Sequence, residues 1–369
     1  MKKSSTRITH IIEATATGTL SMAVLLANSQ ARAGSHVSII YSRRPETPSN
    51  LEMLFLPGIT LKNIQMGSLF EKLASILEIR RTLKFTSPTS VFMHSSFGGF
   101  LGRVASIRAL SETKFFYIPH CISFMRKDIG PLKNLAFSIF EWIGSIKKAD
   151  YIACSNSELE AITARIPFRK CHLIENAINY NEAPTTIQTS LSGRKKSVIT
   201  VGQIRAQKGP EVFSAIAQAV KAIDSDVEFF WVGDGDTKAR QQLESAGVKV
   251  IGWVPKKQVW EHLCQAQLYL STAKWEGMPV SIIEASFAGL PVIASRCSGN
   301  IDVIEHSKTG WLFQSVPEAT QYIITALNDH DLASSQAKAA FDLAQKRFSV
   351  ERYIDDMNTI TNPIQRSSL

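Results

Sequence analysis

Short runs of β-branched and aromatic residues alternate with helical stretches along most of this chain. In the first half, the runs typical of strands are residues 8–12, 37–41, 53–56, 91–94, 115–118, 151–154 and 172–175. Stretches with helical patterns, such as 20–33, 70–83 and 132–146, lie between them. Strands that alternate with helices build parallel sheets that helices cover on both faces. The pattern therefore predicts an α/β fold.

A second series of the same kind follows a polar stretch. Residues 181–196 lack apolar periodicity and are expected to form a linker. Beyond them, strands are expected at 198–201, 227–232, 248–251, 267–270, 291–294 and 311–313, and helices at 211–223, 236–246 and 280–288. We therefore predict two doubly wound parallel-sheet domains, 1–180 and 181–345. An amphipathic pattern over 348–360 predicts a helix within a terminal segment, 346–369.

Composition agrees with two globular domains. A length of 369 residues allows two domains of ordinary size, and 44% hydrophobic with 20% charged residues is typical of a soluble protein. The five cysteines are scattered and form no C-x-x-C pair. This spacing indicates neither a zinc site nor a disulfide framework, so reduced thiols in a cytosolic protein are expected.

The excess positive charge lies entirely in the first half. Residues 1–180 contain 22 Lys and Arg against 12 Asp and Glu, whereas residues 181–369 contain 19 against 20. Such asymmetry favours a polyanionic partner, with anionic lipid or nucleic acid as candidates and an ordinary solvated surface as the alternative. The basic clusters Arg80-Arg81-Lys84, Arg126-Lys127 and Lys147-Lys148 lie beside apolar residues. Because no stacking aromatics interleave with a basic stripe, we expect an anionic membrane surface and no nucleic acid.

The N-terminal segment has some features of a signal peptide. Lys2-Lys3, an apolar stretch at 20–27 and Ala31-Arg32-Ala33 are such features, but His10 and Glu13 interrupt the segment. Cleavage would also remove the first strand and helix of a βαβ unit. We therefore expect a cytoplasmic protein, with a secreted carbohydrate-binding protein as the alternative. No run of 18 apolar residues occurs, so no transmembrane helix is expected.

Two glutamates eight positions apart, Glu276 and Glu284, flank a predicted helix start. Gly277-Met278-Pro279 is typical of a turn, and an apolar helix is expected from Val280. The free backbone N–H groups near Val280 and Ser281 would form an anion site. Carboxylates on both sides of an anion site suit a ligand that has hydroxyls on both sides of a phosphate. A nucleotide-sugar is such a ligand.

The segment from Glu276 to Pro291 resembles the Glu-x7-Glu signature of retaining GT-B glycosyltransferases of family 4, the group 1 glycosyltransferases. The resemblance implies two Rossmann-like domains facing a cleft, with the terminal helix crossing back onto the first domain. It implies that Glu276 orients the donor sugar and that Glu284 holds the ribose hydroxyls.

The segment from Val201 to Gly209 resembles the family's phosphate-binding loop, in which an Arg and a Lys hold the donor diphosphate. Lys208 matches the Lys, whereas Gln203 stands where the family has Arg. A neutral Gln can donate hydrogen bonds but cannot neutralise phosphate. We therefore expect Arg205, two residues further on, to supply the missing charge.

Five shorter matches complete the comparison with the family. Gly233, in Gly233-Asp234-Gly235, resembles a glycine loop after a strand, and Val254 lies in the segment implied to meet the base. Gly18 lies where the family has a glycine-rich loop, and His120 follows Pro119 in a loop implied to approach the donor sugar. Ser155 also matches a family position, but we expect it to be a helix N-cap.

The resemblance implies retaining sugar transfer from a nucleotide-diphosphate sugar. A donor phosphate oxygen would take the acceptor proton, and Lys208 and His120 would act with Glu276 at the reacting sugar. Because the resemblance implies that cationic side chains hold the donor diphosphate in place of a metal ion, neither a metal nor another cofactor is expected. The expected acceptor is a glycan or lipid-linked glycan of bacterial surface polysaccharide, such as O-antigen or capsule, at the inner face of the cytoplasmic membrane. A non-hydrolysing nucleotide-sugar epimerase and a non-catalytic nucleotide-sugar-binding protein are the alternatives.

Overall fold

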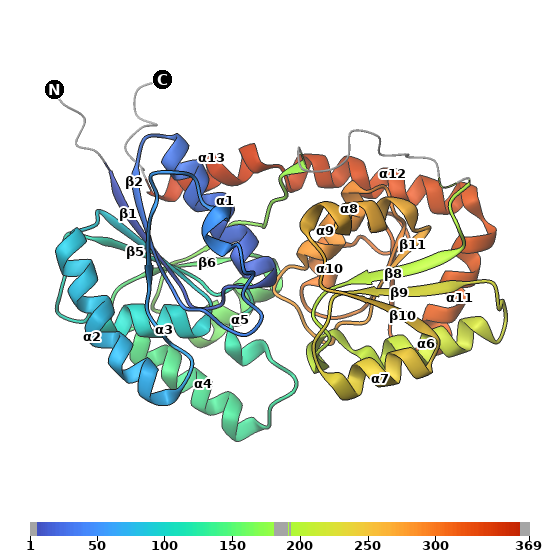
Figure 1. The fold of residues 1–369 in the computed structure, drawn as a ribbon, viewed down its shortest axis with the longest axis horizontal. Coiled ribbons are helices and arrows are strands. Elements are labelled where there is room, and N and C mark those ends of the chain that lie inside the picture. The colour runs from blue at the N-terminus through green and yellow to red at the C-terminus, as the bar shows by residue number, and fades with distance from the viewer. Residues whose placement is uncertain (1–5, 181–190, 192, 362–369) are drawn as a thin grey trace. The chain divides into compact units, whose positions relative to one another are not determined.

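The computed structural model describes residues 6–180, 191 and 193–361. Backbone contacts divide the chain into two units, one formed by the residues up to Glu175 together with those from Tyr353 onward, and the other by Asn176–Arg352. Each unit contains its own parallel sheet with helices packed against it (Figure 1). The predicted fold class, two doubly wound α/β sheets, is confirmed.

The first unit is built on a seven-stranded sheet of order β3-β2-β1-β4-β5-β6-β7. Its strands are β1 (Arg7–Ile12), β2 (His36–Tyr41), β3 (Thr60–Asn63), β4 (Ser90–His94), β5 (Lys114–Ile118), β6 (Asp150–Ala153) and β7 (Cys171–Leu173). All of these strands pair in parallel. The strand order reverses between β1 and β4, and ligands bind beyond the carboxyl ends of strands at such a switch point.

The helices of the first unit are α1 (Thr17–Arg32), α2 (Leu69–Thr86), α3 (Ser96–Ala105), α4 (Pro131–Gly144), α5 (Asn156–Arg165) and most of α13 (Val350–Thr361). Helix α3 contacts both α2 and α4. The buried Arg103 of α3 donates to Glu141 of α4 at 2.7 Å and lies over the ring of Tyr117. The other residues that α4 buries are Ser138 and Gly144, so this helix turns its small and polar side inward.

The second unit contains a six-stranded sheet of order β10-β9-β8-β11-β12-β13. Its strands are β8 (Ser197–Val201), β9 (Glu228–Val232), β10 (Val248–Gly252), β11 (Leu268–Ser271), β12 (Val292–Ser295) and β13 (Trp311–Phe313). Its helices are α6 (Pro210–Lys221), α7 (Thr237–Ser245), α8 (Lys256–Gln265), α9 (Val280–Phe287), α10 (Asn300–Val303), α11 (Val316–Asn328) and α12 (His330–Arg347). Phe213 of α6 packs edge-on against Trp231 and Phe229 of β9 in the core.

Two sequence-based boundaries in the first unit were wrong. The expected strand at 53–56 is absent: Leu51–Leu54 forms a 3-10 turn, and the third strand is β3. The 3-10 turn takes up Met53 and Leu54, and Pro57-Gly58 follows after two more residues, so too few residues remain between them for a strand. Helix α1 begins at Thr17, which places Thr17-Gly18-Thr19 in its first turn and not in a loop.

Ser155 is the N-cap of α5, as predicted, because its hydroxyl accepts from the N–H of Glu158 at 3.1 Å. Most of the expected linker, residues 181–190 and 192, lies outside the described residues. None of the helices within the described ranges is long and apolar enough to cross a membrane.

Candidate active site

The centre of the predicted site in the second unit is an ion pair. Lys208 Nζ lies 2.7 Å from Glu276 Oε1. The amide of Gln207 donates to Glu276 Oε2 at 3.2 Å and to the carbonyl of Trp275 at 2.9 Å. Lys208 follows β8 and Glu276 follows β11, and these two strands are neighbours in the sheet. The carboxyl ends of neighbouring parallel strands meet at one edge, which explains how residues 68 positions apart come together.

The charges of this pair are largely removed from solvent. The Lys208 side chain is 19% exposed and that of Glu276 is 10% exposed. Burial is the largest single effect and opposes the charge on Lys208, but Glu276 and Tyr269 together outweigh it, so the Lys208 pKa is raised. Burial also raises the pKa of Tyr269, against the opposing effects of Lys208 and of a hydrogen bond to Ser281. Tyr269 therefore connects Lys208 with the first turn of α9, which contains Val280 and Ser281.

Arg205 and Gln203 lie on the loop that leads to Lys208. Arg205 is exposed and makes no ion pair with any residue that the structure describes. Its charge nevertheless lowers the pKa of Lys208, so the two cations lie within electrostatic reach of each other. Gln203 is half-buried. This loop therefore presents a free guanidinium beside a lysine that is held by a carboxylate.

Gly233 has an architectural place in this loop system. Its N–H donates to the carbonyl of Gly252 at 2.9 Å, and its φ is +131°. A Cβ at Gly233 would lie 2.2 Å from the carbonyl oxygen of Gly202. Glycine is thus required because two backbone segments touch, and the contact shapes the turn that carries Gln203 and Arg205.

A second close contact positions Glu276. Its N–H donates to the carbonyl of Ser298 at 2.9 Å. Gly299 has a φ of +85°, and a Cβ there would lie 2.6 Å from the Cβ of Glu276. The Ser298-Gly299 loop therefore supports Glu276 through these two contacts.

Glu284 lies on α9 and pairs with a residue that sequence reasoning missed. Lys256 Nζ contacts Glu284 Oε1, and the side chains are 42% and 4% exposed, respectively. Lys256 is the first residue of α8 and follows Val254 by two positions. A lysine at a helix start directly after the expected base-binding segment was the only available signal. Lys256 thus links Glu284 to the start of α8, two residues beyond Val254.

His120 lies in the first unit, just beyond the end of β5. Its φ is +57° and that of Cys121 is +101°, conformations that residues other than glycine rarely adopt. The N–H groups of Cys121 and Ile122 both donate to Glu158 Oε1, at 2.8 and 2.7 Å. Glu158 therefore stabilises a strained loop, a combination that occurs preferentially at functional sites.

Other strained or charged residues share this edge of the first sheet. Thr17, just before Gly18, and Ser95, at the start of α3, also have positive φ values, +54° and +66°. Glu13 is buried after β1, where it pairs with Arg44 and accepts from the Ser95 hydroxyl at 3.3 Å. In the sequence, Glu13 only spoke against a signal peptide. Its position marks it as a further candidate for ligand contact.

Comparisons with known proteins identify the family of this chain. Residues 195–329 match the family model for glycosyl transferases group 1, and residues 17–182 match the model for Glycosyltransferase Family 4.

The chain belongs to the group 1 glycosyltransferases.

Relatives and solved structures extend this result. The glycosyltransferase is 26% identical over 287 residues to a UDP-Gal:alpha-D-GlcNAc-diphosphoundecaprenol alpha-1,3-galactosyltransferase of Escherichia coli, covering 72% of this chain and 71% of the relative. It is 26% identical over 328 residues to an uncharacterized 41.2 kDa protein in the cps region of Klebsiella pneumoniae, covering 85% and 88%. Its fold matches sucrose-phosphate synthase from Thermosynechococcus elongatus with a TM-score of 0.83 at 18% identity, over 98% and 100% of the two chains.

Family membership decides between the alternatives that the sequence left open. The matching models are those of glycosyltransferases, so the protein is an enzyme of this class and neither an epimerase nor a non-catalytic binding protein. Lys208, Glu276, Ser281 and Arg205 share one site in its second unit. Gly18 and His120 lie at the carboxyl edge of the sheet in the first.

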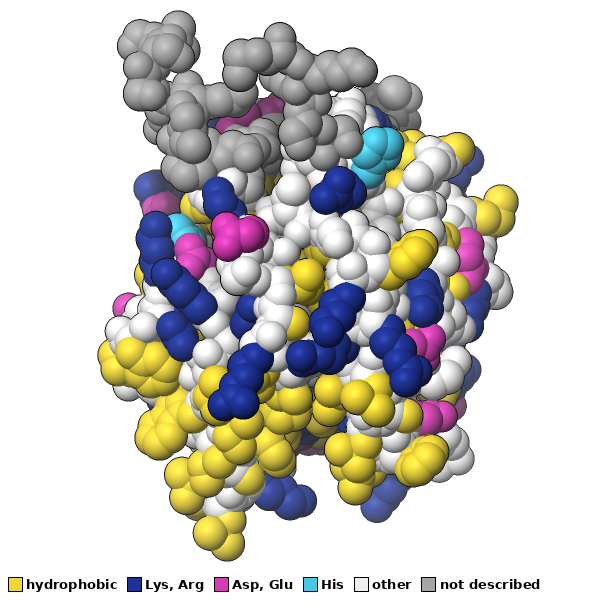
Figure 2. Space-filling model, turned by 90° about the vertical axis from the view of Figure 1, so that its left-hand side faces the viewer, with side chains coloured by type: hydrophobic (Ala, Val, Ile, Leu, Met, Phe, Trp, Pro, Cys, Tyr) yellow, Lys and Arg dark blue, Asp and Glu magenta, His cyan; other side chains and the backbone are white. Residues whose placement is uncertain are grey.

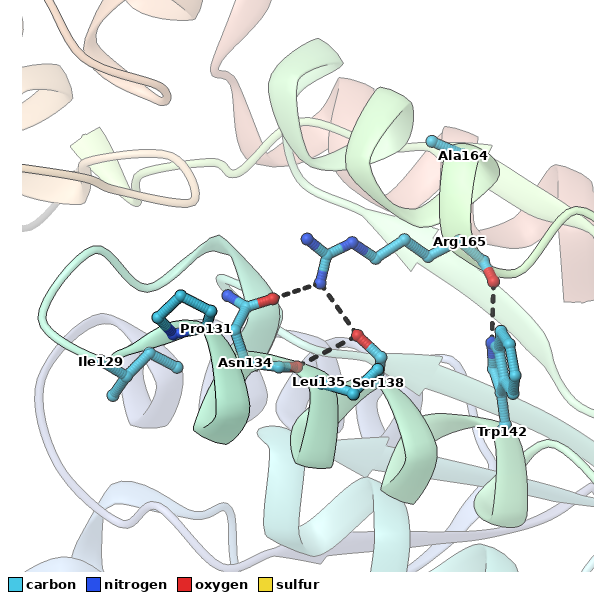
Figure 3. A pocket seen from close by; sticks show the side chains of 8 residues that line it. All are labelled: Ile129, Pro131, Asn134, Leu135, Ser138, Trp142, Ala164 and Arg165. Atoms are coloured by element: carbon cyan, nitrogen blue, oxygen red, sulfur yellow. Dashed lines mark hydrogen bonds between the residues drawn. The ribbon is translucent and has the colours of Figure 1, made fainter.

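The glycosyltransferase has a further groove in its first unit, of about 630 Å³, away from these predicted residues (Figure 3). It lies between α4 and α5. Arg165 donates there to Asn134 Oδ1 at 2.6 Å and to the Ser138 hydroxyl at 2.9 Å. Trp142 donates to the carbonyl of Arg165 at 2.9 Å. Leu135 and Ile129 complete a lining that is mainly apolar.

Proposed function

We propose that this glycosyltransferase moves a sugar from a nucleotide-diphosphate sugar, with retention at the anomeric carbon, to a glycan or lipid-linked acceptor of bacterial surface polysaccharide. The observation that carries the proposal is the buried Lys208–Glu276 pair near the first turn of α9. Lys208, a candidate for phosphate binding, and Glu276, a candidate for binding sugar hydroxyls, form one ion pair. The site therefore matches the junction between the diphosphate and the sugar of such a donor.

The positive charges of the site would stabilise the leaving diphosphate. As the bond between the anomeric carbon and the phosphate oxygen breaks, its electron pair goes to the diphosphate. Lys208, Arg205 and the free N–H groups of Val280 and Ser281 would stabilise the growing negative charge. We propose that these groups supply this charge without a metal ion.

The remaining groups would orient the reactants. Glu276 would accept hydrogen bonds from sugar hydroxyls, Glu284 from the ribose, and His120 would contact the reacting sugar. The acceptor hydroxyl forms the new bond on the face that the diphosphate leaves, and its proton passes to a phosphate oxygen. No protein base is needed for this proton transfer.

A lipid-linked acceptor is supported by the relative named as acting on a diphosphoundecaprenol-linked sugar. It is also supported by the outer surface of α4. Because α4 buries Ser138, Glu141 and Gly144, its apolar residues point outward. Leu132 is 84% exposed and Trp142 is 54% exposed. The other exposed apolar residues are Leu135, Ile139, Phe140 and Ile143 on α4, and Ile146 just beyond its end. An apolar helix surface of this kind suits the interface of a membrane.

Helix α2 also exposes large apolar side chains. Phe70 is 81% exposed and Phe85 is 91% exposed, with Leu69, Leu73 and Leu77 also exposed. Figure 2 shows hydrophobic side chains gathered over one part of this side of the molecule, with Lys and Arg next to them. We propose that α2 and α4 bind an anionic membrane surface peripherally, at the cytoplasmic side, with the lipid part of the acceptor along the groove of Figure 3.

Two basic residues on or just beyond these helices are held by backbone carbonyls and are not available to lipid. Arg80 donates to the carbonyls of Ala105 and Ile107 at 3.2 and 2.8 Å, and Lys147 donates to that of Ala109 at 2.7 Å. Both therefore serve the fold. The exposed Arg81 and Lys84 are better placed for lipid head groups.

The test is a donor and acceptor screen. Thermal shift against UDP-, GDP- and ADP-sugars identifies the donor, because a ligand of the folded state raises stability. Nucleotide release is then measured with and without lipid-linked glycan extracts, and the anomeric configuration of the product is read by NMR. We expect release that depends on acceptor and a retained configuration. Inversion would contradict the retaining mechanism, and release without any acceptor requirement would contradict the transfer.

A further inference from the structure

Three histidines form a continuous hydrogen-bonded chain through the first unit. His10 lies on β1, His94 ends β4, and His120 follows β5, and these strands are neighbours in the sheet. His10 Nδ1 is 3.0 Å from His94 Nε2, and His94 Nδ1 is 3.0 Å from His120 Nε2. Consecutive rings are stacked, with centroids 5.3 and 5.4 Å apart. The chain runs from the interior of the sheet to the strained loop at its edge.

The inner end of the chain has a partner that sets its direction. His10 Nε2 lies 2.8 Å from Gln30 Oε1, on α1, and a carbonyl oxygen can only accept. His10 therefore donates from Nε2 and accepts at Nδ1. His94 must then donate from Nε2 to His10 and accept at Nδ1. His120 donates from Nε2 to His94, which leaves its Nδ1 lone pair as the free end of the chain.

This ordering requires that every ring is neutral. A protonated imidazole donates from both nitrogens and would break the sequence of donors and acceptors. Burial lowers the pKa of His10 and that of His120 to about 4, and that of His94 well below its usual range. All three rings are therefore neutral at physiological pH.

The backbone of His120 is fixed independently of its ring. Glu158 holds the N–H groups of Cys121 and Ile122, and the positive φ of His120 is maintained by these contacts. His120 is the member of the chain that is partly exposed, whereas His10 and His94 are fully buried. An imidazole with a fixed position and a single tautomer is thus presented at the edge where ligands bind in such sheets.

We propose that Gln30, His10 and His94 are positioning residues that hold His120 in the Nε2–H tautomer, so that its Nδ1 accepts a hydrogen bond from a substrate hydroxyl. The contact with substrate rests on the proposed function, whereas the tautomer does not. Gln30 would thus influence the reaction from the far end of the chain without touching substrate.

The experiment uses the full-length protein with ¹⁵N-labelled histidine. Long-range ¹H–¹⁵N correlation spectra identify which ring nitrogen carries the proton. We expect Nε2–H for all three histidines in the wild type. Gln30→Glu keeps an accepting oxygen and should preserve this pattern at alkaline pH, where the new carboxylate does not stabilise a protonated His10. Gln30→Leu removes the acceptor and should give His120 a mixture of tautomers. Ser29→Ala, on the same helix and outside the chain, is the matched control.

Turnover with the identified donor and acceptor is measured for the same variants. We expect Gln30→Leu to lower kcat roughly threefold to tenfold, with donor KM nearly unchanged, and Gln30→Glu to restore it. A wild-type His120 protonated on Nδ1, or an unchanged tautomer in Gln30→Leu, would overturn the proposal. So would a changed tautomer with normal kcat, although the transferase function would then stand. A wild type that transfers no sugar would instead contradict the proposed function.

Discussion

Lys208 Nζ and Glu276 Oε1 lie 2.7 Å apart in a largely buried ion pair, although the two residues are 68 positions apart in the chain. The proposed roles, phosphate for the lysine and sugar hydroxyls for the glutamate, require such proximity. In the absence of donor, the Lys208 ammonium and the Glu276 carboxylate neutralise each other. Binding of donor would therefore exchange part of this pairing for contacts with the ligand.

The first prediction separates the chemistry of this pair from its structural contribution. Lys208→Met leaves Glu276 uncompensated and should lower both Tm and turnover, the latter by roughly 10²–10³-fold. The double variant Lys208→Met/Glu276→Gln removes both charges, so its Tm should return toward the wild-type value while transfer stays absent. Thermal unfolding and nucleotide-release assays measure the two effects. Recovery of turnover in the double variant would contradict the assigned roles.

The raised pKa of Lys208 sets the pH range over which this lysine keeps its charge for donor binding. A lysine whose folded-state pKa is raised stays charged below its unfolded value, and its contribution is lost only as pH rises through the folded value. Donor affinity measured by calorimetry should therefore be insensitive to this group up to a pH of about 10.

The second prediction concerns the free cation of the loop. Arg205→Ala should lower kcat/KM by roughly 10- to 100-fold, because a charged hydrogen bond to phosphate contributes about 1.5–3 kcal/mol. Lys238→Ala, at an exposed position on α7, is the matched control and should have no effect. If Gln203 faces phosphate, Gln203→Arg should tighten donor binding. Wild-type kinetics in Arg205→Ala would rule out its compensating role.

The third prediction tests the ribose contact. Glu284→Ala should weaken nucleotide binding by roughly 10- to 100-fold in calorimetry, for the same reason of a lost charged partner. Lys256→Ala removes the other member of this pair but leaves the carboxylate, so nucleotide affinity should change less than threefold. Equal losses in the two variants would mean that the ion pair itself, and not a ribose contact, supports binding.

The fourth prediction uses two glycines with similar backbone conformations. Gly299 and Gly58 have φ values of +85° and +94°, so alanine is strained at both. Only at Gly299 would the new Cβ contact Glu276, whereas nothing lies within 4 Å at Gly58. Both variants should lose some thermal stability, but only Gly299→Ala should lose turnover. Comparable turnover in the two would show that the Gly299 contact does not position Glu276.

The fifth prediction concerns the membrane. The variant Leu132→Ser/Ile139→Ser/Ile146→Ser should reduce co-sedimentation with anionic vesicles, because exposed apolar area drives interfacial binding. Ile223→Ser, at an exposed isoleucine of the second unit, is the control. Arg81→Ala/Lys84→Ala should weaken binding at low salt, since each cation near such a surface contributes about 1 kcal/mol within a Debye length. Equal recovery on neutral and anionic vesicles would contradict the electrostatic part.

The sequence by itself determined the two parallel α/β sheets. It also predicted that the segments from Gly202 to Lys208 and from Glu276 to Glu284 follow strands and carry the candidate site residues. These features depend on local periodicity and on short motifs, where strand, turn and helix signals agree. It also predicted the N-cap at Ser155, which depends on atoms three residues apart. The strand expected at 53–56 failed because an apolar run does not show whether a neighbouring strand exists to pair with it.

Only the tertiary structure decided how residues distant in the chain share charges and hydrogen bonds. The pairing of Glu284 with Lys256, the support of Glu276 by Gly299, and the chain from Gln30 to His120 depend on which strands are neighbours and where their ends meet. Helix α4 buries its polar side and exposes its apolar side. This orientation depends on the buried Arg103, which pairs with Glu141 and leaves the apolar side chains of α4 outside. A pattern along one helix gives its two faces, but only the packing of the neighbouring elements determines which face is buried.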